Sequence, residues 1–210
     1  AAALIFGGTR WNDNNLISQG KSVCGAMKGF FRGNIIRFVS GSNYNHPSYI
    51  LPAFYEVFAE VDAPNKSFWK DCASKGRNFF HKTCHKTTML APAKANWDGS
   101  PHHGEPFFES DSWRVVGNIM MDWRFFHVDP WQKDEYAVKF AAFWRERQVK
   151  VPMPDELNID GSVRVSHDPP AKGLIAYNAT LGHALPPDEA ELFVKALWDM
   201  EIPSGHYRYY

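Results

Sequence analysis

One short segment combines an acidic residue, an arginine and aromatic residues, and it is the clearest candidate for chemistry in this sequence. In FFESDSWR (residues 107–114), Asp111 follows a long loop and starts a predicted helix, and Arg114 lies one turn later. The amino-terminal end of a helix favours an ionised carboxylate, which is the form that a general base needs. Arg114 can hold that carboxylate, or a neighbouring acid, in place. An ordinary helix start with an i,i+3 ion pair has the same pattern, so the segment alone leaves both interpretations open.

A second candidate is Tyr49, in the segment NHPSYILP (residues 45–52). Two prolines stiffen this predicted helix entrance, and they place the tyrosine where its hydroxyl can reach a cavity at the helix end. A core tyrosine with a satisfied hydroxyl fits the segment equally well. The role of Tyr49 therefore stays open at the level of local sequence.

Histidine and cysteine residues are close together in two places, at His81, Cys84 and His85 and again at His102 and His103. The HxxCH spacing does not match a structural zinc pattern, and a second pair of ligands is lacking, so we expect no metal site. The sequence contains no GxSxG, P-loop or GxGxxG motif. Interpretations as a serine hydrolase, a P-loop enzyme or a Rossmann protein therefore have no support.

The elements that must position these residues are predicted to be mostly helices, because apolar residues recur at helical spacing and no long alternating stretch occurs. We expect one domain over residues 1–210, all-α, with successive helices packed as antiparallel pairs. The expected helices cover residues 1–6 (ended by Gly7-Gly8), 15–31, 47–61, the segment after a cap at Asn65, 111–126 (capped by Ser110), 135–147, 172–184 and 188–200. We also expect an extended piece at 35–39, a functional or disordered loop at 85–109, and a small hairpin at 157–163 around an Asp-Gly turn.

Composition limits the possible functions. The 210 residues carry 23 Lys plus Arg and 23 Asp plus Glu, and this balance argues against a nucleic-acid module, which needs a basic face. No apolar run approaches the roughly 18 residues of a membrane span. Aromatic residues make up 15% of the chain, which hints at a ligand that stacks on rings. Cys24, Cys72 and Cys84 are unpaired in pattern, so we expect reduced thiols and a cytoplasmic location, with secretion left open.

Several segments, in order, resemble glycoside hydrolase family 8. They are RFVSGSNYNHPSYILPAFYEVFAE, FWKDCASKGRNFFHKTCHKTTMLAPAKANWDGSP, FFESDSWRVVGNIMMDW, KGLIAYNA and IPSGHYRYY. The resemblance covers nearly all of the chain from Ile35 onward, and the order of its motifs makes it specific. Within the family the segments are most similar to the xylan-active branch, particularly the reducing-end xylose-releasing exo-oligoxylanases.

The resemblance implies an (α/α)6 barrel, incomplete here, that hydrolyses β-1,4-xylosidic bonds with inversion and uses no cofactor. Asp111 would be the general base, Tyr49 would position the attacking water, and Arg114 would brace the acidic cluster. Inversion requires an acid and a base about 6.5–9.5 Å apart, with room for water between them. The residues expected to contact the xylo-oligosaccharide substrate are Trp113, His167, Tyr207 and Tyr210.

The resemblance also implies that the general acid, a glutamate, precedes Ala1 and that a final helix follows Tyr210. The sequence begins without Met, inside an apolar stretch. We therefore expect a fragment that carries the base but lacks the acid. We expect the 210 residues alone to have negligible hydrolase activity.

Several alternatives remain open at this stage. The segment RVSHDPPAKG (residues 164–173) resembles the region that closes the cleft of exo-acting members, but its His-Asp-Pro is altered, so endo action is possible. A family 8 cellulase or chitosanase would carry the same motifs. A non-catalytic carbohydrate-binding helical protein could keep the aromatic cleft without the acid. The sequence does not predict the oligomeric state.

Overall fold

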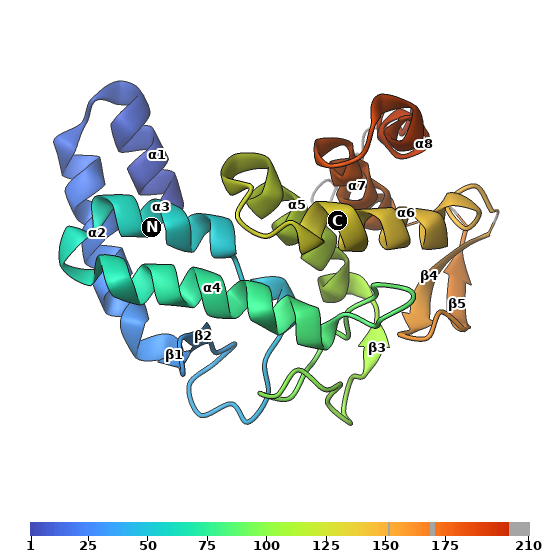
Figure 1. Ribbon diagram of the computed structural model, residues 1–210, viewed down its shortest axis with the longest axis horizontal. Helices are drawn as coiled ribbons and strands as arrows, with labels where there is room; N and C mark the ends of the chain where they lie inside the picture. Colours follow the sequence, from blue (N-terminus) through green and yellow to red (C-terminus); the bar gives the residue numbers. More distant parts are fainter. Residues whose placement is uncertain (151, 169–170, 202–210) are drawn as a thin grey trace.

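Helices dominate the computed structural model, which describes residues 1–150, 152–168 and 171–201 (Figure 1). The α-helices are α1 (Ala2–Trp11), α2 (Asn14–Met27), α3 (Pro52–Val61), α4 (Lys66–Thr83), α5 (Arg114–Phe126), α6 (Val138–Arg145), α7 (Lys172–Ala179) and α8 (Pro187–Trp198). Short 3-10 helices are η1 (Lys28–Phe30), η2 (Pro47–Tyr49), η3 (Ala63–Asn65), η4 (Ser110–Trp113) and η6 (Thr180–His183), and η5 (Gln132–Ala137) is a π-helical turn. The expected helical class is confirmed.

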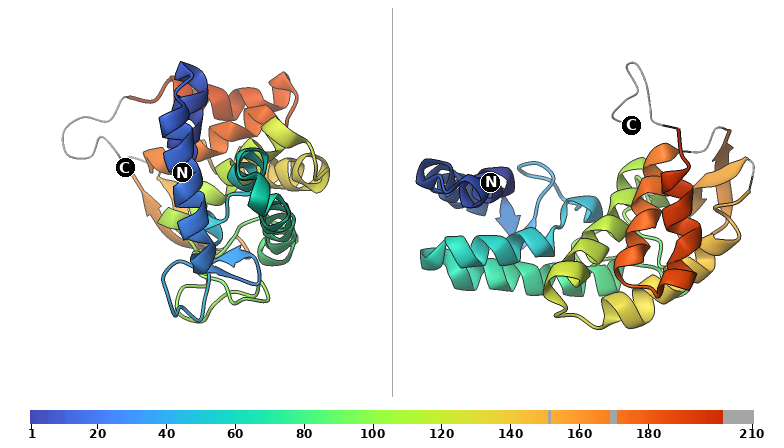
Figure 2. Two further views of the ribbon diagram at one scale, coloured as in Figure 1. Left: turned by 90° about the vertical axis from the view of Figure 1, so that its left-hand side faces the viewer. Right: turned by 90° about the horizontal axis from the view of Figure 1, so that it is seen from above.

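The helices pack largely as neighbours in sequence. α1 packs on α2, α3 on α4 and α7 on α8, while α5 contacts α3, α7 and η6. The pair α1–α2 lies at one end of the molecule and the hairpin of β4 and β5 lies at the other (Figure 2). No helix within the described residues is long and apolar enough to cross a bilayer.

Two small antiparallel sheets accompany the helices. β1 (Phe31–Arg32) pairs with β2 (Ile35–Ile36), and β3 (Phe107–Phe108) pairs with β4 (Met153–Asn158), which pairs with β5 (Val163–His167). The hairpin expected at 157–163 is confirmed and is longer than expected. Its turn contains Gly161 at φ +94°, a conformation that glycine adopts without strain.

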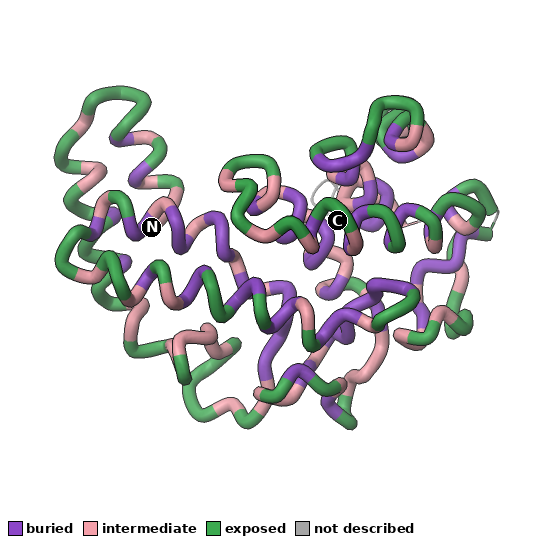
Figure 3. The backbone as a smooth tube through the Cα atoms, viewed as in Figure 1, coloured by how far each residue is buried: buried purple, intermediate pink, exposed green. Residues whose placement is uncertain are grey.

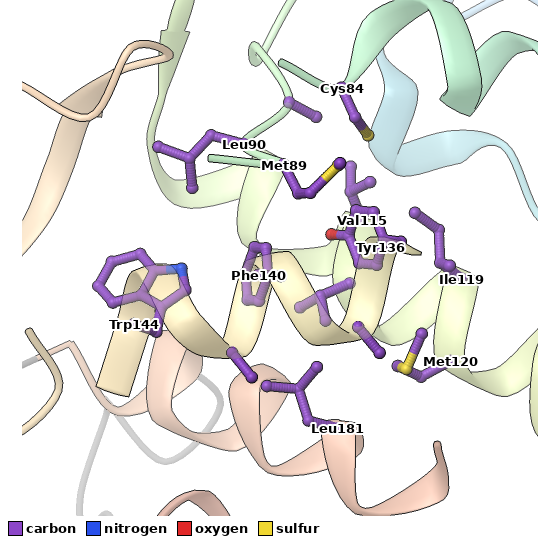
Figure 4. Packing of buried hydrophobic residues seen from close by; sticks show 14 of the residues in the cluster. Cys84, Met89, Leu90, Val115, Ile119, Met120, Tyr136, Phe140, Trp144 and Leu181 are labelled. Atoms are coloured by element: carbon purple, nitrogen blue, oxygen red, sulfur yellow. The ribbon is translucent and has the colours of Figure 1, made fainter. Parts of the chain in front are cut away.

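The core consists of two clusters of buried hydrophobic residues. The larger one surrounds α5 and α6, where the rings of Tyr136 and Phe140 stack with their centres 5.4 Å apart (Figure 4). The smaller one lies between α3 and α4 around Trp69, which is fully buried. Buried residues are concentrated through the middle of the molecule, whereas α1, α2 and α8 expose much of their surface (Figure 3).

A buried ionic network joins three of these helices. Arg77 on α4 donates two hydrogen bonds of 2.7 Å to both carboxylate oxygens of Asp122 on α5. The same guanidinium donates to Glu56 on α3 at 2.8 Å, and Gln132 donates to Asp122 at 2.6 Å. Because each of these groups lies inside the protein, the network fixes how α3, α4 and α5 pack against one another.

The structure corrects the expected end of the first helix at Gly7-Gly8. α1 continues through both glycines to Trp11. A Cβ atom at Gly8 would lie 2.6 Å from Cγ1 of Ile17 on α2. The glycine therefore allows the close approach of the next helix, and it does not terminate its own helix.

Two other expected boundaries are wrong for local reasons. The helix expected over 47–61 is divided, because Pro52 has no N–H to continue from η2 and instead begins α3. Ser110 does not cap the helix that follows: Glu109 is the cap residue of η4, and the backbone N–H of Glu109 donates to Oγ of Ser112 at 2.8 Å. Ser110 has a φ of +24°, so the backbone turns sharply immediately before Asp111.

Candidate active site

The expected ion pair between Asp111 and Arg114 is present. Nη2 of Arg114 lies 2.6 Å from Oδ1 of Asp111, and the two side chains are 33% and 43% exposed, respectively. Asp111 belongs to η4 and Arg114 is the first residue of α5, so the sharp turn at Ser110 presents both groups at the start of the helix. The carboxylate is held through one oxygen and remains open to water.

Tyr49 lies beside this pair, although it is more than 60 residues away in sequence. The centre of its ring is 5.0 Å from the guanidinium carbon of Arg114. Asn118 on α5 donates to the carbonyl oxygens of Ser48 at 2.9 Å and Ile50 at 3.2 Å, which are the residues on either side of Tyr49. α5 therefore holds η2 in place, and the fold brings the three predicted catalytic residues together.

His46 belongs to the same region and was missed by the sequence reasoning. Its side chain is buried, with its ring centre 4.4 Å from Phe38 and 5.8 Å from Tyr49. Burial lowers the pKa of His46, and the nearby charge of Asp111 works in the opposite direction. Neither ring nitrogen has a hydrogen-bond partner among the described residues. The only signal in the sequence was its position in the segment that contains Tyr49.

Trp113 connects η4 to the β4–β5 hairpin. Its indole Nε1 donates to the carbonyl oxygen of Asp155 on β4 at 3.1 Å. A Cβ atom at Gly173 would lie 3.6 Å from the indole ring, so α7 packs closely against the same side chain. Trp113, predicted as a sugar-contacting residue, thus also fixes the hairpin relative to Asp111.

His167 ends β5 and is about half exposed. Its Nδ1 lies 2.7 and 2.8 Å from the two carboxylate oxygens of Asp155. This hydrogen bond and the charge of Asp155 raise the pKa of His167. The remaining predicted substrate-contacting residues, Tyr207 and Tyr210, lie outside the described part of the chain.

A second arginine pairs with an acidic residue close to Asp111. Nη1 of Arg164 on β5 lies 2.8 Å from Oε2 of Glu109, and its guanidinium lies over the ring of Phe107 at 3.5 Å. Sequence reasoning did not find this pair, since β5 is more than 50 residues away. The Glu109 side chain is 23% exposed and that of Asp111 is 43% exposed, so Asp111 is the more accessible carboxylate at η4.

The histidines and cysteines form no metal centre within the described residues, where no group of three possible ligands lies together. Nε2 of His81 instead lies 2.8 Å from Asp129, and its ring stacks on Trp131 with the centres 4.1 Å apart. Cys24, Cys72 and Cys84 are buried and unpaired.

Along its length the chain is similar to known enzymes. No family model matches the chain. A reducing-end xylose-releasing exo-oligoxylanase of Paenibacillus barcinonensis is 31% identical, and the match covers 100% of this chain and 60% of that protein. A reducing-end xylose-releasing exo-oligoxylanase of Halalkalibacterium halodurans is 30% identical over 100% of this chain and 58% of its own length. The chain therefore spans less than two thirds of the length of these curated relatives.

Solved structures agree with the sequence matches. A point mutant of the Paenibacillus barcinonensis enzyme, complexed with an arabinofuranosyl-xylotetraose, superposes with a TM-score of 0.88 at 31% identity, covering 99% of this chain and 59% of that chain. A family 8 xylanase mutant of Teredinibacter turnerae in complex with xylohexaose gives a TM-score of 0.89 at 28% identity, covering 99% and 60%.

The helical fold and these matches define the class: the described chain corresponds to part of the (α/α)6 barrel of family 8 glycoside hydrolases. Along its whole length it is similar to the reducing-end xylose-releasing exo-oligoxylanases of that family. The resemblance drawn from its motifs is confirmed.

Proposed function

We propose that this chain carries the general-base side of an inverting glycoside hydrolase that acts on xylo-oligosaccharides, with Asp111 as the base. The observation that carries the proposal is the convergence of Asp111, Arg114 and Tyr49 at the start of α5. Arg114 binds one oxygen of the carboxylate and holds it in place. The exposed remainder of the carboxylate is available to take a proton from water.

In the proposed reaction, water attacks the anomeric carbon from the face opposite the leaving oxygen. Asp111 removes a proton from this water, and a carboxylic acid about 6.5–9.5 Å away protonates the leaving oxygen. The hydroxyl of Tyr49, whose ring lies against Arg114, holds the water in line. We assign the acid to a glutamate outside these 210 residues, as the resemblance to the family implies.

Trp113 and His167 are the proposed sugar contacts within the described chain. The solved relatives in complex with xylobiose, xylohexaose and an arabinofuranosyl-xylotetraose support this class of substrate. Release of xylose from the reducing end is the proposed mode of action, because two curated relatives that match the whole chain have this activity in their names. Endo action is the alternative, because the segment RVSHDPPAKG (residues 164–173) departs from the pattern of exo-acting members.

The test uses the chain alone and a chimera that adds the segments flanking the matched region in the Paenibacillus barcinonensis relative. Release of reducing sugar from xylotriose and xylohexaose is measured for both. We expect turnover by the chimera and negligible turnover by the 210 residues. In the chimera, Asp111→Asn should reduce kcat by at least about 10²-fold, the usual contribution of a general base.

The matched control is Asp160→Asn, which changes an exposed aspartate in the β4–β5 turn. Normal cleavage by the Asp111→Asn chimera would show that the base lies elsewhere. Binding of xylohexaose without cleavage by the unmutated chimera would favour a non-catalytic carbohydrate-binding protein. Xylose as the first product from xylohexaose supports exo action, whereas a mixture of internal products supports endo action.

A further inference from the structure

An acidic side chain is buried at an irregular position in the β4–β5 hairpin. Pro154 pairs with Ser166 and Glu156 pairs with Val165, so Asp155 is an extra residue on β4. Such a bulge redirects the side chain of the extra residue, and bulges are frequent next to active sites. The Asp155 side chain is only 1% exposed. A carboxylate at such a depth requires a partner, because its removal from water is costly.

His167 is that partner. Its Nδ1 lies 2.7 and 2.8 Å from the two oxygens of Asp155, while its own side chain is 53% exposed. An ionised carboxylate only accepts hydrogen bonds, so Nδ1 carries the hydrogen. Nε2 then points away from the carboxylate, and it has no hydrogen-bond partner among the described residues. The pair thus consists of a buried anchor and an exposed imidazole with one nitrogen available.

This pair is attached directly to the candidate active site. The indole N–H of Trp113 donates to the backbone carbonyl of Asp155, the same residue whose carboxylate holds the imidazole. Trp113 itself lies two residues after Asp111 in η4. One residue of β4 therefore fixes the position of His167 relative to the proposed base.

We propose that Asp155 is a positioning residue that orients the imidazole of His167, so that Nε2 hydrogen-bonds to a hydroxyl of the bound xylo-oligosaccharide. This inference rests on the proposed function. It assigns a role in substrate recognition to a buried residue that does not touch the sugar itself.

The surrounding charges are consistent with this role. The bond to Asp155 and the charge of Asp155 raise the pKa of His167, and Glu156 adds to the effect. Charged side chains on the neighbouring elements have partners of their own. Arg164 pairs with Glu109 and Glu156. Arg114 pairs with Asp111, and Lys172 donates to the carbonyl oxygen of Glu201. Sugar affinity should therefore fall as the pH rises through the raised pKa of His167.

The first measurement is the titration of His167 in the 210-residue chain by nitrogen-15 NMR, with His167→Gln used to assign its signals. We expect the hydrogen on Nδ1 in the neutral form and a pKa above that of an ordinary histidine. Asp155→Asn keeps the size of the side chain and removes its charge, so it should lower the pKa of His167. The control Asp160→Asn should leave the titration unchanged.

The second measurement is xylotriose affinity by calorimetry at pH 6 and pH 8. Asp155→Asn should weaken binding by roughly fivefold at pH 6, the difference between a charged and a neutral hydrogen bond. It should also reduce the loss of affinity between the two pH values. Asp160→Asn should bind as the unmutated chain does.

Each outcome decides a separate point. If the unmutated chain binds xylotriose but Asp155→Asn changes neither affinity nor the pKa of His167, the positioning role is wrong. If neither the unmutated chain nor the chimera binds xylotriose while Asp155→Asn lowers that pKa, the proposed substrate class fails and the Asp155–His167 pairing stands. If Asp155→Asn does not fold, as judged by circular dichroism, the test of the sugar contact is made on the unmutated chain. Xylotriose must then shift the Nε2 resonance of His167, and an unchanged resonance overturns the proposal.

Discussion

Two arginine–carboxylate systems lie at opposite ends of the segment formed by η4 and α5, and they differ in their access to water. Near the end of α5, the side chains of Arg77 and Asp122 are 7% and 1% exposed. At the start, the side chains of Arg114 and Asp111 are 33% and 43% exposed. An arginine–aspartate pair therefore lies in the interior near one end of this segment and at the surface at the other end.

The buried system stabilises the fold, whereas the exposed pair leaves a carboxylate accessible for chemistry. In the buried system, Asp122 receives bonds from Arg77 and Gln132, and Arg77 also binds Glu56. This compensation of the buried charges is necessary, because an uncompensated charge in the interior is costly. The exposed pair needs no such compensation and contributes little to stability, typically about 0–1 kcal/mol. It can therefore leave part of Asp111 available for a ligand.

The largest expected effect comes from breaking the buried system. Arg77→Met should lower the free energy of unfolding by about 3–5 kcal/mol, because it leaves Asp122 buried without its cation and leaves Glu56 with Lys70 alone. Urea denaturation followed by circular dichroism measures the change. A loss of less than about 1 kcal/mol would mean that water or other groups replace the guanidinium, and the contrast between the two systems would fail.

Breaking the exposed pair should have little effect on stability. Asp111→Asn should change the free energy of unfolding of the 210-residue chain by less than about 1 kcal/mol, since water already solvates the carboxylate. The same denaturation experiment, run beside Arg77→Met, makes the comparison direct. A loss as large as that of Arg77→Met would show that Asp111 stabilises the fold. It would then not be a carboxylate that is free to act on a ligand.

The smallest expected effects concern pH, and two histidines near the site should act with opposite signs. Burial lowers the pKa of His46, so the unfolded chain binds its proton more readily, and stability should fall as the pH drops below about 6.5. Asp155 raises the pKa of His167, so the stability that this pair contributes is complete below about 6.5 and is lost as the pH rises through the raised pKa.

Urea denaturation at pH 5, 7 and 9 tests both signs. His46→Gln should reduce the loss of stability between pH 7 and pH 5. His167→Gln should reduce the loss between pH 7 and pH 9. The reverse assignment of the two effects would contradict the burial of His46 and the pairing of His167 with Asp155.

Local features were predictable from the sequence. The ion pair of Asp111 and Arg114 follows from helical spacing, because residues three apart lie on one face. The hairpin follows from the Asp160-Gly161 turn, because glycine tolerates a positive φ. The prediction failed at Gly7-Gly8, where a glycine pair has two interpretations: it can end a helix, or it can admit a neighbouring helix.

What the sequence by itself determined is the set of helices, the turn and the local pair at the start of α5, because these depend on interactions within a few residues. Only the tertiary structure placed Tyr49 beside Arg114, buried His46 nearby and joined Asp155 to both Trp113 and His167. It also selected Arg77 as the partner of Asp122, 45 residues away. Such contacts depend on how whole helices and strands pack, and the spacing of residues along one element does not specify that packing.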